Sequence, residues 1–205
     1  MVPLRNLPGP QADFLDLFNI AAGAATWRQV ALDDAMTSAS KRTRLYEMPS
    51  DPRVRATVRA FWRDLLRDRL EAYEAGGAAF ATVAQYERDV MGLRATMNKN
   101  FPGVFLQRRL KTFDPGFRVA HAQKSLSLVL KHGWCNGVIE MPPQCVVDRR
   151  VLKVAGATQV ERRWTDVNTW DEHLTKIDIL AAAARRHADW PLTMAEWELW
   201  AFGRR

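Results

Sequence analysis

Two side chains that could carry chemistry, an amine and a carboxylate, lie in the segment from residue 120 to residue 152. Lys124 falls near the start of one expected helix, and Asp148 immediately precedes the next one. A glycine-containing turn and a loop with Pro142 and Pro143 separate them. A lysine in a basic helix commonly contacts solvent or phosphate, and an aspartate before a helix caps it, which contributes about 1 kcal/mol. A chemical role and a capping role can coexist at Asp148.

The order of lysine helix, loop, Val147-Asp148 and second helix resembles the helix-hairpin-helix DNA glycosylase superfamily. In its lyase-competent branch, which includes endonuclease III and the 8-oxoguanine glycosylase/lyases, the lysine is the nucleophile and the aspartate is its partner. The resemblance therefore gives these roles to Lys124 and Asp148. The amine attacks the sugar carbon of an extruded nucleotide, the base leaves, and a Schiff base remains. The carboxylate orients the substrate and stabilises the cationic sugar.

The chain departs from the pattern of that family just before the lysine helix. A Gly-x-Gly hairpin normally holds a DNA phosphate there, whereas this chain has FRVAHAQ at residues 117 to 123. The separation of Lys124 and Asp148 is also longer than usual in the family. The resemblance implies a divergent DNA glycosylase/AP lyase that acts on a modified or damaged purine. The alternative is a non-catalytic basic helical protein that binds nucleic acid or a protein partner in a phage, mobile-element or defence system.

The formal net charge of +7 is concentrated in one segment. Residues 91 to 132 contain eight lysines and arginines and a single acidic residue, Asp114. Such a surplus attracts polyanions, which makes nucleic acid, DNA above all, the expected partner. A basic surface without a ligand explains the charge equally well. The residues expected to contact nucleic acid are Arg108, Arg109, Lys111, Arg118, Lys131 and Arg149.

The tryptophans and the cysteines suggest two further kinds of site. An extruded base could stack on Trp134, beside the lysine helix, or on Trp164, with Asp166 reading the edge of the base, although most indoles at helical spacing face a core. Four nitrogen and sulfur ligands would suffice for a structural zinc ion, but no Cys-x-x-Cys or His-x-x-x-His pair is present. These four ligands are His121, His132, Cys135 and Cys145. Buried free thiols are the simpler interpretation, so we expect neither a metal nor a cofactor.

Helical periodicity accounts for the elements that must position these residues. Asp51-Pro52 is a strong helix start, because the aspartate can cap the helix and proline loses no hydrogen bond at the first helical position. Caps at Asn168 and Asp171 and a capping box at Thr193 predict two helices near the C-terminus. The expected helices cover residues 11 to 39 in one or two pieces, 52 to 75, 78 to 98, a short piece within 104 to 117, 119 to 132, 168 to 187, and 193 onward. The expected common core contains Val54, Val58, Phe61, Leu65, Leu126, Val129, Leu130 and Val151.

Length and composition bound the class of protein. The chain has 205 residues, 47% of them hydrophobic and 26% charged, with no linker-like stretch, no internal repeat and no pair of alternating runs. We expect one all-α, helix-hairpin-helix glycosylase-like domain that spans residues 1 to 205. The N-terminal MVPLRNLPGP carries no apolar signal core, no run is long enough to cross a bilayer, and there are only two cysteines. These features predict a cytoplasmic protein with no membrane partner.

Overall fold

The computed structural model describes residues 9–20, 25–41, 43–47, 51–107, 115–186 and 193–203. Within these ranges all regular elements are helical, apart from an isolated bridge between Tyr46 and Phe105. The predicted all-α class is therefore confirmed, and the described helices pack around one common core. The α-helices are α1 (Gly9–Asp16), α2 (Trp27–Ser40), α3 (Pro52–Gly76), α4 (Val83–Asn100), α5 (Val119–Cys135), α6 (Arg149–Val154), α7 (Trp170–Arg185) and α8 (Met194–Gly203). Two single turns of 3-10 helix, η1 (Gly77–Ala79) and η2 (Trp164–Asp166), complete the set in these ranges.

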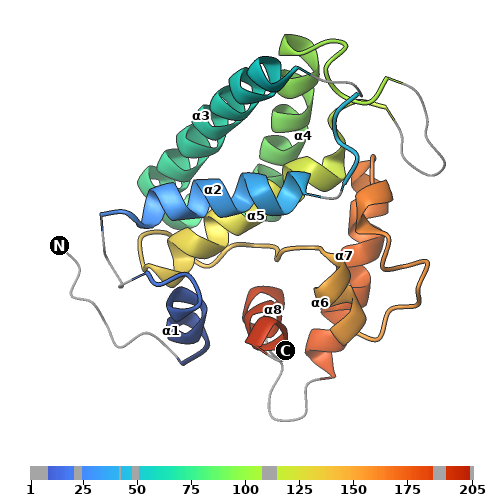
Figure 1. Cartoon of the computed structure of the whole chain (residues 1–205). Helices are drawn as coiled ribbons and strands as arrows, with labels where there is room; N and C mark the ends of the chain where they lie inside the picture. Colours follow the sequence, from blue (N-terminus) through green and yellow to red (C-terminus); the bar gives the residue numbers. More distant parts are fainter. Residues whose placement is uncertain are drawn as a thin grey trace.

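Helix α5 runs through the middle of the molecule (Figure 1). Helix α2 lies alongside it, α3 and α4 lie on one side of this pair, and α1, α6, α7 and α8 lie on the other. Every residue of α5 except Trp134 is buried. Because neighbouring helices enclose α5, its backbone is held in place. Side chains that extend from α5 toward α6 or α8 therefore start from fixed positions.

The two helix starts with the clearest sequence signals are confirmed. Asp51 accepts a hydrogen bond from the backbone N–H of Arg53, and proline occupies the first turn of α3. At α8, the hydroxyl of Thr193 accepts from the backbone N–H of Glu196, and the carboxylate of Glu196 accepts from the backbone N–H of Thr193. Both sets of contacts satisfy N–H groups that have no partner within the helix.

The start of α7 lies one residue away from the predicted cap. The cap is Thr169, whose hydroxyl accepts from the backbone N–H of Glu172, while the Glu172 carboxylate accepts from the backbone N–H groups of Asn168 and Thr169. The prediction placed the cap at Asn168 and overlooked this reciprocal pair. A threonine three residues before a glutamate satisfies two free N–H groups at once, which an asparagine at residue 168 would not do here.

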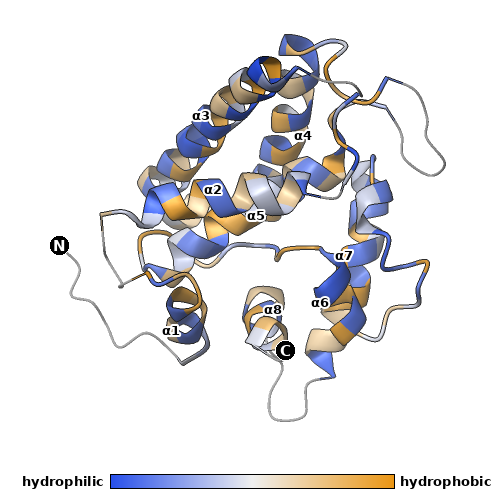
Figure 2. Ribbon diagram, viewed as in Figure 1, coloured by the Kyte–Doolittle hydropathy of each residue, from blue (hydrophilic) through white to orange (hydrophobic). Residues whose placement is uncertain are grey.

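The hydrophobic core surrounds α5. Helices α3 and α4 alternate between hydrophilic and hydrophobic residues along their length, as expected for helices with one buried face (Figure 2). Of the residues predicted for the core, Phe61 and Leu65 are only partly buried against it, and Val54 is 38% exposed. Val54 lies in the first turn of α3, and its prediction as a core residue is wrong. The buried members are Val58, Leu126, Val129, Leu130 and Val151.

The approach to α5 is fixed by one asparagine. The side chain of Asn98, on α4, accepts a hydrogen bond from the backbone N–H of Phe117 and donates one to the Phe117 carbonyl. Half of the segment in which a short helix is expected, residues 104 to 117, lies outside the described residues, and its described parts, 104–107 and 115–117, are not helical. None of the helices that the structure describes is long and apolar enough to cross a membrane.

The extended segment that leads to α6 is held by a buried histidine of α7. Nε2 of His173 lies 2.7 Å from Oε1 of Gln144, to which it donates. Burial lowers the pKa of His173 from its ordinary value of 6.5 to about 4. The imidazole is therefore neutral in the folded protein at pH values at which it is protonated in the unfolded chain.

This difference predicts a loss of stability in mild acid. Because the folded pKa is the lower one, the contribution of His173 is complete above pH 6.5 and declines as the pH falls toward 4, by up to about 3 kcal/mol. Urea unfolding at pH 7 and pH 4.5 should show a smaller acid-induced loss for His173→Gln than for the unsubstituted protein, by about 2 kcal/mol. Equal losses in the two proteins would contradict the assignment of a buried neutral imidazole.

Candidate functional site

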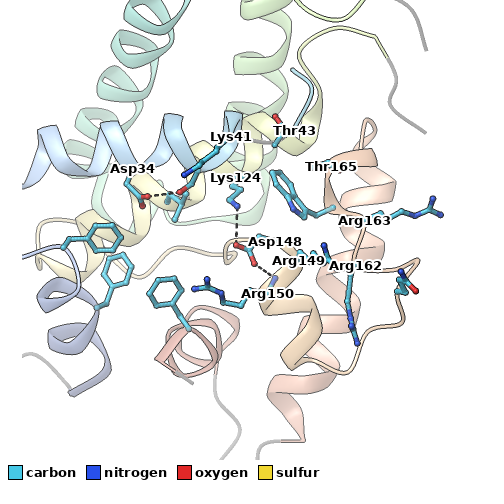
Figure 3. A pocket seen from close by; sticks show the side chains of 17 residues that line it. Asp34, Lys41, Thr43, Lys124, Asp148, Arg149, Arg150, Arg162, Arg163 and Thr165 are labelled. Atoms are coloured by element: carbon cyan, nitrogen blue, oxygen red, sulfur yellow. Dashed lines mark hydrogen bonds and ion pairs between the residues drawn. The ribbon is translucent and has the colours of Figure 1, made fainter. Parts of the chain in front are cut away.

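The structure brings Lys124 and Asp148 into contact. Lys124 lies in the second turn of α5, and its Nζ is 3.3 Å from Oδ2 of Asp148. The same amine lies over the indole of Trp164, 4.4 Å from the ring centroid. The side chain of Lys124 is only 11% exposed, so both contacts form in a largely desolvated place. The amine is thus contacted from two directions. Figure 3 shows its contact with Asp148.

Asp148 is the N-cap of α6, as the sequence predicted, and its two carboxylate oxygens have different partners. Oδ1 accepts from the backbone N–H groups of Arg150 and Val151, at 2.9 and 3.0 Å, whereas Oδ2 faces the lysine amine. Burial alone would raise the pKa of this carboxyl, but the Lys124 ammonium and the two backbone N–H groups outweigh burial and hold the pKa below its ordinary value. Asp148 is therefore ionised at neutral pH.

The residues next to this pair are clamped together as well. Gln123, which precedes Lys124, donates from Nε2 to the backbone carbonyl of Val147 at 2.9 Å and accepts at Oε1 from the Val147 N–H at 3.3 Å. All four groups belong to buried residues. The side-chain amide of Gln123 therefore pairs with the backbone of Val147 as a neighbouring β-strand would. This Gln123–Val147 clamp fixes the position of the next residue, Asp148, relative to α5.

The pair lies at a cleft of about 790 Å³ between α2, α5, α6 and the loop that precedes η2. Trp164 and Thr165 also line it. Among the described residues that line it, six are basic and two, Asp34 and Asp148, are acidic. The basic residues are Lys41, Lys124, Arg149, Arg150, Arg162 and Arg163. A concave site with this balance of charge concentrates anions.

The residues predicted to contact nucleic acid differ in where they lie. Arg149 is exposed at the cleft. Arg118 and Lys131 are buried, so their prediction as surface contacts is corrected: Arg118 donates to the carbonyl of Thr43 at 2.9 Å, and Lys131 forms an ion pair with Glu198 at 2.9 Å. Both belong to the enclosed helix α5 or its N-cap, which explains why their charge does not reach the surface. Arg108, Arg109 and Lys111 lie outside the described residues.

Of the three residues predicted for a base pocket, only Trp164 lines the cleft. Trp134 is ten residues beyond Lys124 on α5, about 15 Å away along the helix axis, and it lines a separate small cavity. Asp166 pairs with Arg163 at 3.6 Å and is not part of the cleft lining. Asp166 therefore positions an arginine of the cleft and does not face its interior.

The zinc alternative has no support among the described residues, which contain no group of three or more histidine, cysteine or acidic side chains placed to hold a metal ion. Cys135 and Cys145 are free and buried, as expected from the sequence. Burial raises the pKa of the Cys135 thiol to about 12, and it raises the pKa of Cys145 as well. Neither thiol is a thiolate nucleophile at neutral pH.

Several residues of the cleft were not predicted from the sequence. Arg150, Arg162 and Arg163 could have been noticed as members of two arginine pairs, Arg149-Arg150 and Arg162-Arg163, which stand outside the segment with the largest charge surplus. Asp34 has no such signal, because it lies on α2, ninety-eight residues before its buried partner His132.

Comparison with known proteins finds no family model, no curated protein and no solved structure that matches this chain. The class that fold and site define is an all-α, single-domain protein with a lysine–aspartate pair at the floor of a basic cleft.

The Gln123–Val147 clamp predicts a specific sensitivity to substitution. Gln123→Glu replaces the donor that faces the Val147 carbonyl with a second acceptor, so it should lower the free energy of unfolding by about 1–3 kcal/mol. The same change at the exposed Gln159 should alter stability by less than about 0.5 kcal/mol. Urea denaturation of both variants measures the difference. Equal stability of the two variants would show that the clamp contributes nothing.

Proposed function

We propose that this protein is a DNA glycosylase with associated AP lyase activity, which acts on a modified or damaged purine through a Schiff base on Lys124. The observation that carries the proposal is the 3.3 Å contact between Lys124 Nζ and Asp148 Oδ2 in the cationic cleft. An amine nucleophile with a carboxylate within hydrogen-bond reach, in a concave site, is the arrangement that such chemistry requires. The resemblance of residues 120 to 152 to the helix-hairpin-helix glycosylases supports the same assignment.

The dimensions and charge of the cleft suit an extruded nucleotide. A volume of about 790 Å³ falls within the range usual for small-molecule sites, so a single nucleotide fits. Enzymes that act on a base inside a duplex turn the nucleotide out of the stack into such a pocket. The arginines at the cleft, Arg149, Arg162 and Arg163, would then contact the flanking phosphates.

In the proposed reaction, Asp148 accepts a proton from the Lys124 ammonium, and the freed electron pair forms a bond to the sugar carbon C1′. The electron pair of the glycosidic bond leaves with the base, which receives the proton from Asp148. The ring oxygen then departs from C1′ with a proton from the lysine nitrogen, and a protonated Schiff base remains. A carboxylate at the start of α6 also stabilises the positive charge that develops on the sugar. Trp164, over the amine, excludes water from one side of it.

Borohydride trapping tests the nucleophile directly. On DNA that carries an abasic site or a panel of modified purines, the unsubstituted protein should give a covalent adduct and Lys124→Gln should give none, because the amine that forms the Schiff base is lost. Lys153→Gln, an exposed lysine on α6, is the matched control and should trap normally. Asp148→Asn should slow base release by about 10²-fold or more while the helix cap is kept. Adducts with Lys124→Gln, or none with the unsubstituted protein, would exclude the proposed chemistry.

The salt dependence of DNA binding tests the role of the cleft arginines. Reversal of charge at Arg149, Arg162 and Arg163 should weaken binding and reduce the slope of log K against log salt by about one for each phosphate that the protein no longer neutralises. Arg53→Glu, on the exposed start of α3, should leave the slope unchanged. A slope unaffected by the three reversals would place DNA elsewhere. Strong salt-dependent binding without trapping would instead favour the non-catalytic nucleic-acid-binding alternative.

A further inference from the structure

The two ends of the cleft differ in chemistry. Arg162 and Arg163 lie on one side of Lys124, and Asp34, on α2, lies on the other (Figure 3). Three phenylalanines line the cleft with Asp34: Phe14, on α1, Phe18, just after α1, and Phe202, on α8. The cleft thus passes from cationic side chains, through the lysine amine, to a carboxylate with aromatic neighbours.

The Asp34 carboxylate is held in place by two donors. Its Oδ1 accepts from the hydroxyl of Ser38 at 2.8 Å, and its Oδ2 lies 3.4 Å from Nε2 of His132, which is buried on α5. The rings of Phe14 and Phe18 each lie 4.8 Å from the His132 ring. The hydrogen bond requires the His132 proton on Nε2, so the packed imidazole orients the carboxylate toward the cleft. Each carboxylate oxygen still has acceptor capacity for a ligand.

The surroundings of the Asp34 carboxyl also determine its ionisation state. Burial raises the pKa of Asp34, but the hydrogen bonds from His132 and Ser38 and the charge of Lys131 outweigh burial and lower the pKa overall. Burial also lowers the pKa of His132, against the effect of Asp34. At neutral pH the pair is therefore an aspartate anion and a neutral imidazole. A ligand group that meets Asp34 must supply hydrogen-bond donors, since the carboxylate has none to give.

We propose that this end of the cleft is a base-recognition subsite, in which Asp34 accepts two hydrogen bonds from the edge of a guanine-type purine. In that edge a ring N–H lies beside an exocyclic amino group, so two donors face two carboxylate oxygens. Adenine and cytosine place an acceptor nitrogen beside the amino group, and thymine flanks its N–H with carbonyls. Each of those edges would bring an acceptor against the anion. The inference rests on the proposed function and adds the class of base to it.

The spacing along α5 agrees with a nucleotide that lies across the site. Lys124 and His132 are eight residues apart, which corresponds to about 12 Å along the helix, and Leu128 lines the cleft between them. Phosphate at the arginines, sugar at the lysine amine and base at Asp34 is the order of groups in a nucleotide. Lys131 and Arg150 lie over the Phe202 ring, 4.3 and 5.7 Å from its centroid, and stacking of a flat base on Phe18 would tolerate every base. Discrimination would therefore come from Asp34.

Binding of free bases tests this subsite whichever modified base the protein removes. The protein is first bound to duplex DNA that contains a tetrahydrofuran abasic analogue, which leaves the base position empty, and equilibrium dialysis then measures binding of guanine, hypoxanthine and adenine. Guanine should bind about tenfold or more tightly than adenine, with hypoxanthine, which lacks the amino group, between them. Asp34→Asn should abolish this preference, because its amide presents one donor and one acceptor. Asp33→Asn should keep it, since the neighbouring Asp33 pairs with Arg63 of α3.

Each outcome decides between the inference and the function on which it rests. Borohydride trapping on a true abasic site needs no base, so the unsubstituted protein and Asp33→Asn should both trap, while an unchanged far-UV circular-dichroism spectrum shows that Asp34→Asn is folded. Equal binding of guanine and adenine, a preference for adenine, no binding of any base, or a preference that survives in Asp34→Asn would overturn the subsite while trapping leaves the proposed function standing. A protein that neither binds DNA nor traps would remove both.

Discussion

Lys124 and Asp148 are joined twice, once by their own ion pair and once through their neighbours Gln123 and Val147. Taking a charged pair out of water costs free energy, and the attraction between the charges offsets this only when the geometry is good and the other hydrogen bonds are satisfied. Here the second oxygen of Asp148 is satisfied by the start of α6. The position of α6, the shape of the cleft and the orientation of the amine therefore all depend on this double junction.

Because α5 is enclosed, it also fixes the side chains at the Asp34 end of the cleft. One face of this helix presents Lys124 and Leu128 to the cleft, and the next turn supports Asp34 through His132. A third buried pair, Lys131 with Glu198, ties α8 to the same helix. A nucleotide bound in the cleft would thus meet side chains whose spacing is set by a single rigid element, which favours catalysis because little reorganisation remains for the reacting state.

Local sequence signals predicted the elements well, because caps and periodicity act over a few residues. The capping of α6 by Asp148 and of α3 by Asp51 are examples. The location of charge was predicted poorly. Arg118 and Lys131 look like surface residues in a basic segment, but whether a helix is central depends on contacts with distant elements. Asp34 was not predicted for the same reason, since its partner is provided by tertiary packing alone.

We expect the Lys124 amine, and no other amine of the chain, to form the covalent bond to the sugar. This can be tested by reducing the complex with abasic DNA, digesting the protein and locating the adduct by mass spectrometry. A deoxyribose-derived mass should be found on Lys124 alone, because among the described residues only this amine combines contact with Asp148, contact with Trp164 and access to the cleft. An adduct on another lysine or on the N-terminal amine, with Lys124 unmodified, would contradict this expectation.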